Sequence, residues 1–344
     1  MRTLYPVLLA VALASGLLGC RAGGGGETGD DAPPIDAAVD APGPGCWALS
    51  PRTVAPETFV GPTGLQNRLF ALIDGAQTKL DVSMYLFTAT AIADRLIAAK
   101  NRGVAVRVLF DPDHLGNANV RTRLTNGGVT HRNAPTIYTF VHAKYLVIDG
   151  KAAVIMSANL NPDAMTNERN YGLVTRDPDD VADAQAIFNM DWASGGGEPA
   201  QPADLACTRL VVSPNNAKAR IVALVESAQS TLDVEAMYVA EDTVRMAIGA
   251  AKQRGVTVRV ILETGSDNAE TRSYFTGLGI PVHAPGNFFL HAKLLIADGV
   301  AFVGSENFSL TALTKNRELG AMVFEPAAAA VIQQQFDADW AATN

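Results

Sequence analysis

The sequence has few cysteines, few histidines, no excess of basic charge and, beyond its first twenty residues, no long apolar run. After residue 20 no stretch approaches the roughly 18 consecutive apolar residues of a membrane span. The 27 Lys and Arg against 35 Asp and Glu give a net charge of -8, which argues against a general nucleic-acid binder, since such proteins gain affinity from a basic surface. The 5 His and 3 Cys show no ligand spacing typical of a metal site, so no metal or other cofactor is expected.

The first 45 residues have the composition of an export signal followed by a disordered tether. Residues 1–20, MRTLYPVLLAVALASGLLGC, carry one Arg, a short apolar run and small residues before Cys20, an order typical of an export signal. The ending Leu-Leu-Gly-Cys resembles the lipobox of bacterial lipoproteins, which implies lipidation of Cys20. Residues 21–45 are rich in Gly, Pro, Ala and Asp and predict a disordered tether. We therefore expect an exported protein, either anchored in the cell envelope by lipid or, with a plain secretory signal, secreted.

Two further cysteines, Cys46 and Cys207, each precede the first expected strand of one half of the chain. An exported chain favours a disulfide between them. A bond that ties the two halves together and two separate thiols both fit the sequence.

The chain beyond residue 45 is a duplication, visible as four pairs of matching segments. The pairs are LDVSMYLF (80–87) with LDVEAMYV (232–239), AAKNRGVAVRVLFD (98–111) with AAKQRGVTVRVILE (250–263), VHAKYLVIDG (141–150) with LHAKLLIADG (290–299), and SANLN (157–161) with SENFS (305–309). Each half closes with Phe-x-x-Asp-Trp, whose aromatics we expect to anchor a terminal helix in the core. The duplication predicts one lobe over 46–196 and another over 205–344, with the boundary in 194–204.

Each half alternates strand and helix patterns. A β-branched run is followed by a helix-length segment that ends at Gly103 or Gly255, and then by a second strand. Two more strands are joined at Asp149-Gly150 or Asp298-Gly299, and Asp-Gly between apolar runs is a strong hairpin signal. Strands that alternate with helices predict an α/β fold in which helices cover each sheet.

The repeated His-x-Lys pairs are the candidate chemistry. Residues two apart on a strand point to one face, so His142 and Lys144 emerge together, as do His291 and Lys293. Two imidazoles and two ammonium groups suit an anion with several oxygens, such as phosphate. One His can attack phosphorus while the other donates a proton to the leaving alcohol. The remaining histidines are expected to be structural: His114, His131 and His283.

The paired pattern H-x-K-x4-D, followed by Ser-x-Asn, resembles the phospholipase D superfamily over residues 59–341. The matching residues are His142, Lys144, Asp149, Ser157 and Asn159 in the first copy, and His291, Lys293, Asp298, Ser305, Asn307 and Glu318 in the second. The resemblance implies two pseudo-symmetric lobes that share one active site at their interface. It also implies a metal-independent phosphodiesterase that works through a covalent phosphohistidine.

By this resemblance His142 is the nucleophile, His291 is the acid and then the base, and Glu318 orients a catalytic His. The expected catalytic residues are His142, His291, Lys144, Lys293, Asp149, Asp298 and Glu318. Asp149 and Asp298 lie at turns, where their simplest role is local, either capping the turn or holding a neighbour in place. The expected phosphate-binding side chains are Lys144, Lys293, Asn159, Asn307, Ser157 and Ser305.

Two departures from the motif make the halves unequal. Gly precedes the motif Ser in the second copy, as Gly304, but Met156 stands there in the first. The position that matches Glu318 is Asn170, with Glu168 two residues earlier. This inequality fits different roles for the two His, and it also fits reduced activity.

The resemblance allows several substrates, because the motif recognises only the phosphate. The export signal and the acidic domain favour phospholipid at a membrane surface, hydrolysed by water or transferred to an alcohol. One alternative is an exported endonuclease, with a basic cleft built from Arg107, Arg121, Arg123 and Arg132. A cardiolipin synthase-like transferase and an inactive binding module are the others.

Overall fold

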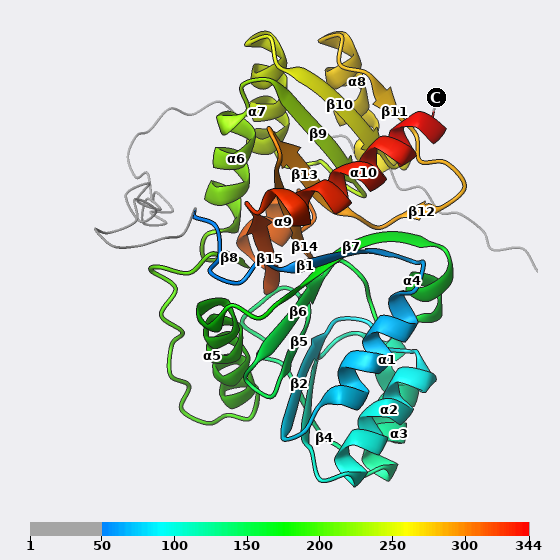
Figure 1. The fold of residues 1–344 in the computed structure, drawn as a ribbon, viewed down its shortest axis with the longest axis vertical. Helices are drawn as coiled ribbons and strands as arrows, with labels where there is room; N and C mark the ends of the chain where they lie inside the picture. The colour runs from blue at the N-terminus through cyan, green and yellow to red at the C-terminus, as the bar shows by residue number, and fades with distance from the viewer. Residues whose placement is uncertain (1–49, 344) are drawn as a thin grey trace, which may run out of the picture. The chain divides into compact units, whose positions relative to one another are not determined.

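The computed structural model describes residues 50–343, and the repeat appears in it as two lobes built in the same order (Figure 1). The elements of the first lobe are β1 (Glu57–Gly61), α1 (Leu65–Gly75), β2 (Lys79–Met84), α2 (Thr90–Asn101), β3 (Ala105–Phe110), the 3-10 turn η1 (Leu115–Asn117), α3 (Ala118–Asn126), β4 (Thr130–Asn133), β5 (Lys144–Ile148), β6 (Ala152–Met156), α4 (Pro162–Thr166), β7 (Glu168–Thr175) and α5 (Pro178–Gly195).

The second lobe repeats this order with small differences at its sheet edges. Its elements are β8 (Leu210–Ser213), α6 (Ala217–Ser227), β9 (Thr231–Ala236), α7 (Asp242–Gln253), β10 (Thr257–Leu262), η2 (Ser266–Asn268), α8 (Ala269–Gly277), β11 (Val282–His283), β12 (Phe289–Leu290), β13 (Lys293–Ala297), β14 (Val300–Gly304), α9 (Leu310–Thr314), β15 (Glu318–Val323) and α10 (Pro326–Ala342). The predicted α/β class with helix-covered sheets is confirmed.

Within residues 50–343 the strands form two mixed sheets, in the orders β1-β7-β6-β5-β2-β3-β4 and β11-β10-β9-β13-β14-β15-β8. β2 is parallel to β3 and antiparallel to β5, and β9 has the same relation to β10 and β13. The predicted hairpins β5–β6 and β13–β14 are present. At their turns Asp149 and Asp298 have positive φ, as do the following glycines, as expected for a tight two-residue turn.

The two sheets share a central core. Tyr145 and Val147 of β5 face this core together with Leu294 and Ile296 of β13, whereas Leu146 and Ile148 belong to the outer core of the first lobe. Figure 1 shows α1, α2 and α3 on the outer side of the first sheet, and α5 on its other side. The predicted aromatic anchors are confirmed, since Phe188 and Phe336 are fully buried in the central core and Trp192 nearly so.

Reciprocal contacts bind the lobes together. β12 of the second lobe pairs with β7 of the first, so that Leu290 lies opposite Arg169, and Val141 forms the matching bridge with Arg317. The side chain of Arg317 forms a two-pronged ion pair with Asp191 of α5, at 2.9 and 3.1 Å. Arg169 does the same with Asp339 of α10, at 2.7 and 2.9 Å. Each lobe therefore holds an arginine of the other.

Cys207 is disulfide-bonded; its predicted partner Cys46 lies outside the described residues. The predicted signal peptide, tether and lipidated Cys20 also lie outside them. Between residues 50 and 343, none of the helices has the length and apolar composition that crossing a bilayer requires.

Candidate active site

The His-x-Lys pairs lie where β5 and β13 begin, and each is held in place by the opposite lobe. The backbone N–H of His142 donates to the carbonyl of Arg317 at 2.9 Å, and that of His291 donates to the carbonyl of Arg169 at 3.2 Å. Both lysines are buried, and Nζ of Lys293 donates to the carbonyl of His291 at 2.7 Å. Lys144 makes the same contact with His142. The predicted pairing of each His with its Lys is therefore present twice.

Glu318 of the second lobe orients His142 of the first. Its two carboxylate oxygens lie 3.0 and 2.9 Å from Nδ1 of His142, and the carboxylate is fully buried. Nδ2 of Asn316 donates to Oε1 of Glu318 at 2.9 Å and so supports the carboxylate. A proton on Nδ1 leaves Nε2 with its lone pair, which is the form a nucleophile needs.

His291 is oriented in the same way by the first lobe, but through an amide. Oδ1 of Asn170 lies 3.0 Å from Nδ1 of His291 and also accepts from the hydroxyl of Ser157 at 2.8 Å. Nδ2 of Asn170 donates to Glu168 at 3.2 Å, which leaves the nearest carboxylate oxygen of Glu168 3.8 Å from Nδ1. Asn170, which departs from the motif, is thus a direct hydrogen-bond partner of His291.

The four motif side chains are close enough to shift each other's pKa. Burial lowers the pKa of His142 to about 4, while Glu318 opposes the shift. Burial, and then the charges of Lys293 and Lys144, lower the pKa of His291 well below its usual range. Burial also lowers the pKa of Lys293 to about 7. Burial and mutual repulsion disfavour the protonated forms of these groups. A bound anion stabilises those positive forms, so the cluster favours anion binding.

The expected phosphate ligands divide into two kinds. Oδ1 of both Asn159 and Asn307 has no hydrogen-bond partner among the described residues, and Asn307 lines a pocket of about 460 Å³ together with His142. Ser157 and Ser305 are buried instead behind the histidine partners: Ser157 binds Asn170, and Ser305 accepts from the N–H of Leu319 at 3.0 Å. The serines therefore support the residues that orient the imidazoles.

Asp149 and Asp298 lie away from the histidines. Asp149 is five positions beyond Lys144, about 16 Å along an extended strand. Its carboxylate accepts from the backbone N–H groups of residues 77–79, and Asp298 does the same with residues 229–231. These bonds hold the loop before β2 or β9 in place, which agrees with a local role. The motif predicts a catalytic part for both Asp; the structure instead binds their carboxylates to these loops, at the end of the strand opposite to the histidines.

The difference between Gly304 in the second copy and Met156 in the first has a packing cause. A Cβ at position 304 would collide with Oε2 of Glu306 and would lie 2.6 Å from Cα of Gly320. Glu306 is fully buried, and neither carboxylate oxygen has a partner among the described residues. Burial and the neighbouring Glu318 raise its pKa well above the usual value. In the first copy the small Ala158 replaces Glu306, and Met156 fills the space.

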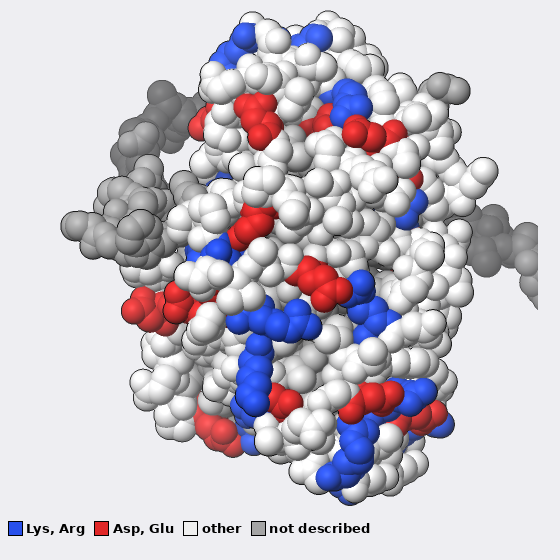
Figure 2. Space-filling model, viewed as in Figure 1, with Lys and Arg blue, Asp and Glu red and all other residues white. Residues whose placement is uncertain are grey.

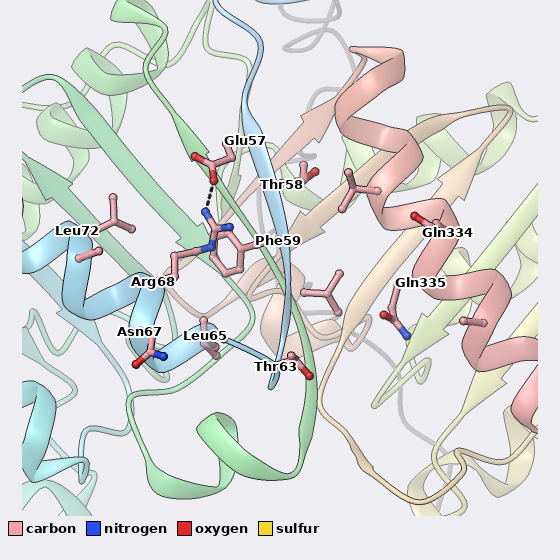
Figure 3. Close-up of a pocket in the computed structure, with 15 residues that line it drawn as sticks. Glu57, Thr58, Phe59, Thr63, Leu65, Asn67, Arg68, Leu72, Gln334 and Gln335 are labelled. Carbon is pink, nitrogen blue, oxygen red and sulfur yellow. Dashed lines mark hydrogen bonds and ion pairs between the residues drawn. The ribbon is translucent and has the colours of Figure 1, made fainter.

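A larger cavity elsewhere in the protein contains none of these groups. It measures about 910 Å³ and lies between β1, α1 and α10, where Glu57 and Arg68 face Gln334 and Gln335 (Figure 3). We place the site at the histidines, because the smaller pocket is lined by His142, whose backbone carbonyl binds the buried Lys144. The larger cavity has no His or Lys in its lining.

The sequence missed the residues that join the lobes at the site. These are Arg169, Arg317, Asp191 and Asp339; the sequence also missed Asn316, which supports Glu318 within the second lobe. A signal was present, because Asp recurs in both Phe-x-x-Asp-Trp segments and an Arg directly precedes both Asn170 and Glu318. Residues 50–343 contain no group of three His, Cys, Asp or Glu side chains placed to hold a metal ion.

Two lobes of this topology, with a His-x-Lys pair from each, define a duplicated phospholipase D-like protein. The chain matches the family described as "Cardiolipin synthase, PLD-like domain" over residues 69–192 and 221–340. It therefore belongs to this family within the phospholipase D superfamily.

Curated relatives include a probable cardiolipin synthase of Bacillus subtilis, 24% identical over 314 residues, and a cardiolipin synthase of Listeria monocytogenes, 24% identical over 317 residues. The alignments cover 79% and 78% of this chain but only 63% and 65% of those proteins. The chain thus spans somewhat less than two thirds of their length.

Solved structures support the fold. Phosphatidylserine synthase of Haemophilus influenzae superposes with a TM-score of 0.66 at 14% identity, over 86% of this chain and 89% of that one. Polyphosphate kinase of Porphyromonas gingivalis superposes with a TM-score of 0.64 at 17% identity, over 82% of this chain and 46% of that one. Two sheets flanked by helices are thus the architecture of this group.

The comparison corrects the predicted localisation. The relatives that match 78–79% of the chain are named as cardiolipin synthases, and none of the names describes an exported lipoprotein. The prediction of an exported protein, lipid-anchored or secreted, is therefore wrong. The export-like composition of residues 1–20 misled it, because a short apolar run at the start of a chain has more than one meaning.

Proposed function

We propose that the protein transfers the phosphatidyl group of a phospholipid to the hydroxyl of an acceptor lipid, as a cardiolipin synthase does. The observation that carries the proposal is the crossed orientation of the histidines: Glu318 holds Nδ1 of His142 and Asn170 holds Nδ1 of His291, each from the opposite lobe. Both Nε2 atoms are left for chemistry in one cluster with two buried lysines. The sequence allowed both hydrolysis and transfer, and the relatives named cardiolipin synthases favour transfer.

The reaction takes place in two displacements. Nε2 of His142 attacks phosphorus of the first phosphatidylglycerol, and the P–O bond to the glycerol head group breaks. The departing oxygen takes the proton of His291 Nε2, and glycerol leaves. The hydroxyl of the second phosphatidylglycerol then gives its proton to His291 and attacks phosphorus, which breaks the P–N bond and releases cardiolipin and neutral His142.

The remaining motif residues stabilise the phosphorus centre. Lys144 and Lys293 supply positive charge beside the phosphate oxygens, and the side-chain amides of Asn159 and Asn307 donate to them. Because these groups already neutralise the developing charge, the proposed reaction uses no metal. Lysine is rarely a metal ligand in proteins, and in the proposed reaction the two lysines supply the positive charge themselves.

The surroundings of the site favour a lipid. Tyr85, Phe140 and Tyr238 line the pocket beside His142, and Phe140 also lines an adjoining pocket with Leu115, which is 89% exposed. Leu310, 53% exposed, lies between two further lining residues. Exposed apolar side chains around a phosphate site suit acyl chains and the bilayer surface.

The residues expected to form a nucleic-acid cleft are already engaged within the protein. Arg107, Arg123 and Arg132 pair with Asp81, Asp94 and Glu198 at 2.7, 2.5 and 2.8 Å, and Arg121 binds Asn133 and a carbonyl. On the face shown in Figure 2, basic and acidic side chains lie mostly next to each other. These pairings leave little unbalanced positive charge for a phosphate backbone.

The test incubates the full chain with phosphatidylglycerol vesicles and identifies lipid products by mass spectrometry. We expect cardiolipin, and in the presence of a primary alcohol also the phosphatidyl alcohol, and the His291→Ala variant should form either product at a rate at least about a hundredfold lower. Cleavage of single-stranded DNA without any lipid product would establish the nuclease alternative instead. No product from folded protein with either substrate would support an inactive binding site.

A further inference from the structure

The two segments that orient the histidines carry the same residues in reversed order. The first copy reads Glu168-Arg169-Asn170 and the second reads Asn316-Arg317-Glu318. The central arginines occupy matching places, since each binds an Asp of the other lobe and offers its carbonyl to the other lobe's histidine. The backbone frame is therefore the same, and the outer two positions can be compared directly.

In each three-residue segment the third residue contacts the histidine of the other lobe, and the first residue contacts the third. In the second copy the carboxylate of Glu318 touches His142, and the amide of Asn316 supports that carboxylate. In the first copy the amide of Asn170 touches His291, and the carboxylate of Glu168 lies behind that amide. Each copy thus has one carboxylate and one amide, but only His142 has the charge in direct contact.

We propose, on the basis of the function above, that this exchange of Glu and Asn divides the labour between the two histidines. Glu318 makes His142 the nucleophile, because a carboxylate at Nδ1 stabilises the positive charge that the ring gains when the N–P bond forms. Asn170 is a positioning residue that fixes the tautomer of His291 without such stabilisation. The protonated form of His291 is therefore a strong acid that gives its proton readily to the leaving oxygen.

The groups around each ring are consistent with this division. The titratable groups that face His291 are Lys293 on its own strand, Lys144 and His142 of the first lobe, and Glu168 behind Asn170. Those that face His142 are Glu318, Lys144, Lys293, His291 and Tyr85, whose ring packs edge-on against the imidazole. Burial lowers the pKa of both rings; at His142 the carboxylate of Glu318 opposes this effect, whereas at His291 the charges of Lys293, Lys144 and His142 add to it.

The test exchanges charge and amide without changing the length of either side chain. In E168Q/N170D, the new carboxylate at position 170 accepts from His291, and the new amide at position 168 can donate to that carboxylate as Asn316 donates to Glu318. An opposite charge in contact raises a pKa by about one to three units. In a plot of kcat/KM against pH, one limb reports the protonation of the proton donor. We expect this limb to move to higher pH by at least one unit in E168Q/N170D. The matched control, E168Q alone, should move it by less.

Histidine NMR titration measures the same shift without turnover. We expect the His291 ring to titrate at least one pH unit higher in E168Q/N170D than in the wild type, with His142 unchanged. A chain that lacks lipid activity yet shows this shift refutes the proposed function and leaves the electrostatic assignment standing. Superimposable titrations of His291 overturn the inference. If the double variant does not fold, N170D alone carries the same carboxylate against His291, now beside that of Glu168, and should move the His291 titration in the same direction. An unchanged titration in N170D overturns the inference as well.

Discussion

Replacing His142 by Ala should reduce cardiolipin formation to background, and replacing His291 by Ala should reduce it by about 10²–10⁴-fold, the usual contribution of a positioned acid or base. Both losses follow from one shared site, in which each histidine is oriented by the opposite lobe. Initial rates at saturating phosphatidylglycerol measure the effect, and thermal unfolding shows that the variants are folded.

His131→Ala is the matched control for these variants. His131 lies on β4, where its ring bonds to Thr125, away from the motif pairs. The control should retain at least half of the wild-type rate. A motif variant that also retained half of the rate would indicate two independent sites, one in each lobe, and would contradict the shared site.

Replacing Asp191 by Ala should lower the free energy of unfolding by about 3–5 kcal/mol, the cost of breaking a buried ion pair by removing one partner. Arg317 is only 1% exposed and is bonded to both oxygens of Asp191. Without them its charge stays buried at the joint between the lobes. Denaturant unfolding of the full chain, with the disulfide intact, measures the change.

Two comparisons isolate the cause of that loss. Asp94→Ala breaks the pair with Arg123, whose side chains are 46% and 50% exposed, and should change stability by no more than about 1 kcal/mol. Asp191→Leu combined with Arg317→Met removes both charges and should recover much of the loss. A stability of Asp191→Ala close to that of Asp94→Ala would show that the pair does not hold the lobes together.

The fold followed from the sequence where the signals were local and repeated. Asp149-Gly150 and Asp298-Gly299 predicted hairpins because few residues tolerate positive φ, and the structure has both turns. The duplication strengthened these predictions, since a second copy of each signal makes coincidence improbable.

The site followed only in part, because its orienting contacts cross between the lobes. Glu318 lies 176 residues from His142 in the chain, and Asn170 lies 121 residues from His291. The sequence marked Asn170 as a departure from the motif, but neither spacing nor periodicity indicates that it bonds to the histidine of the other copy. Conversely, Asp149 belongs to the motif and yet lies at the far end of its strand, where it binds loop N–H groups.

The most direct test is to trap the covalent intermediate on one histidine. The His291→Ala variant is incubated with phosphatidyl p-nitrophenol, whose phenolate leaves without protonation, and is quenched in alkaline denaturant because an N–P bond is labile to acid. With no base to activate the acceptor, the intermediate accumulates. We predict a phosphatidyl adduct on the peptide that contains His142, and none in His142→Ala. An adduct on any other residue, or release of p-nitrophenol by His142→Ala at the wild-type rate, would contradict the account.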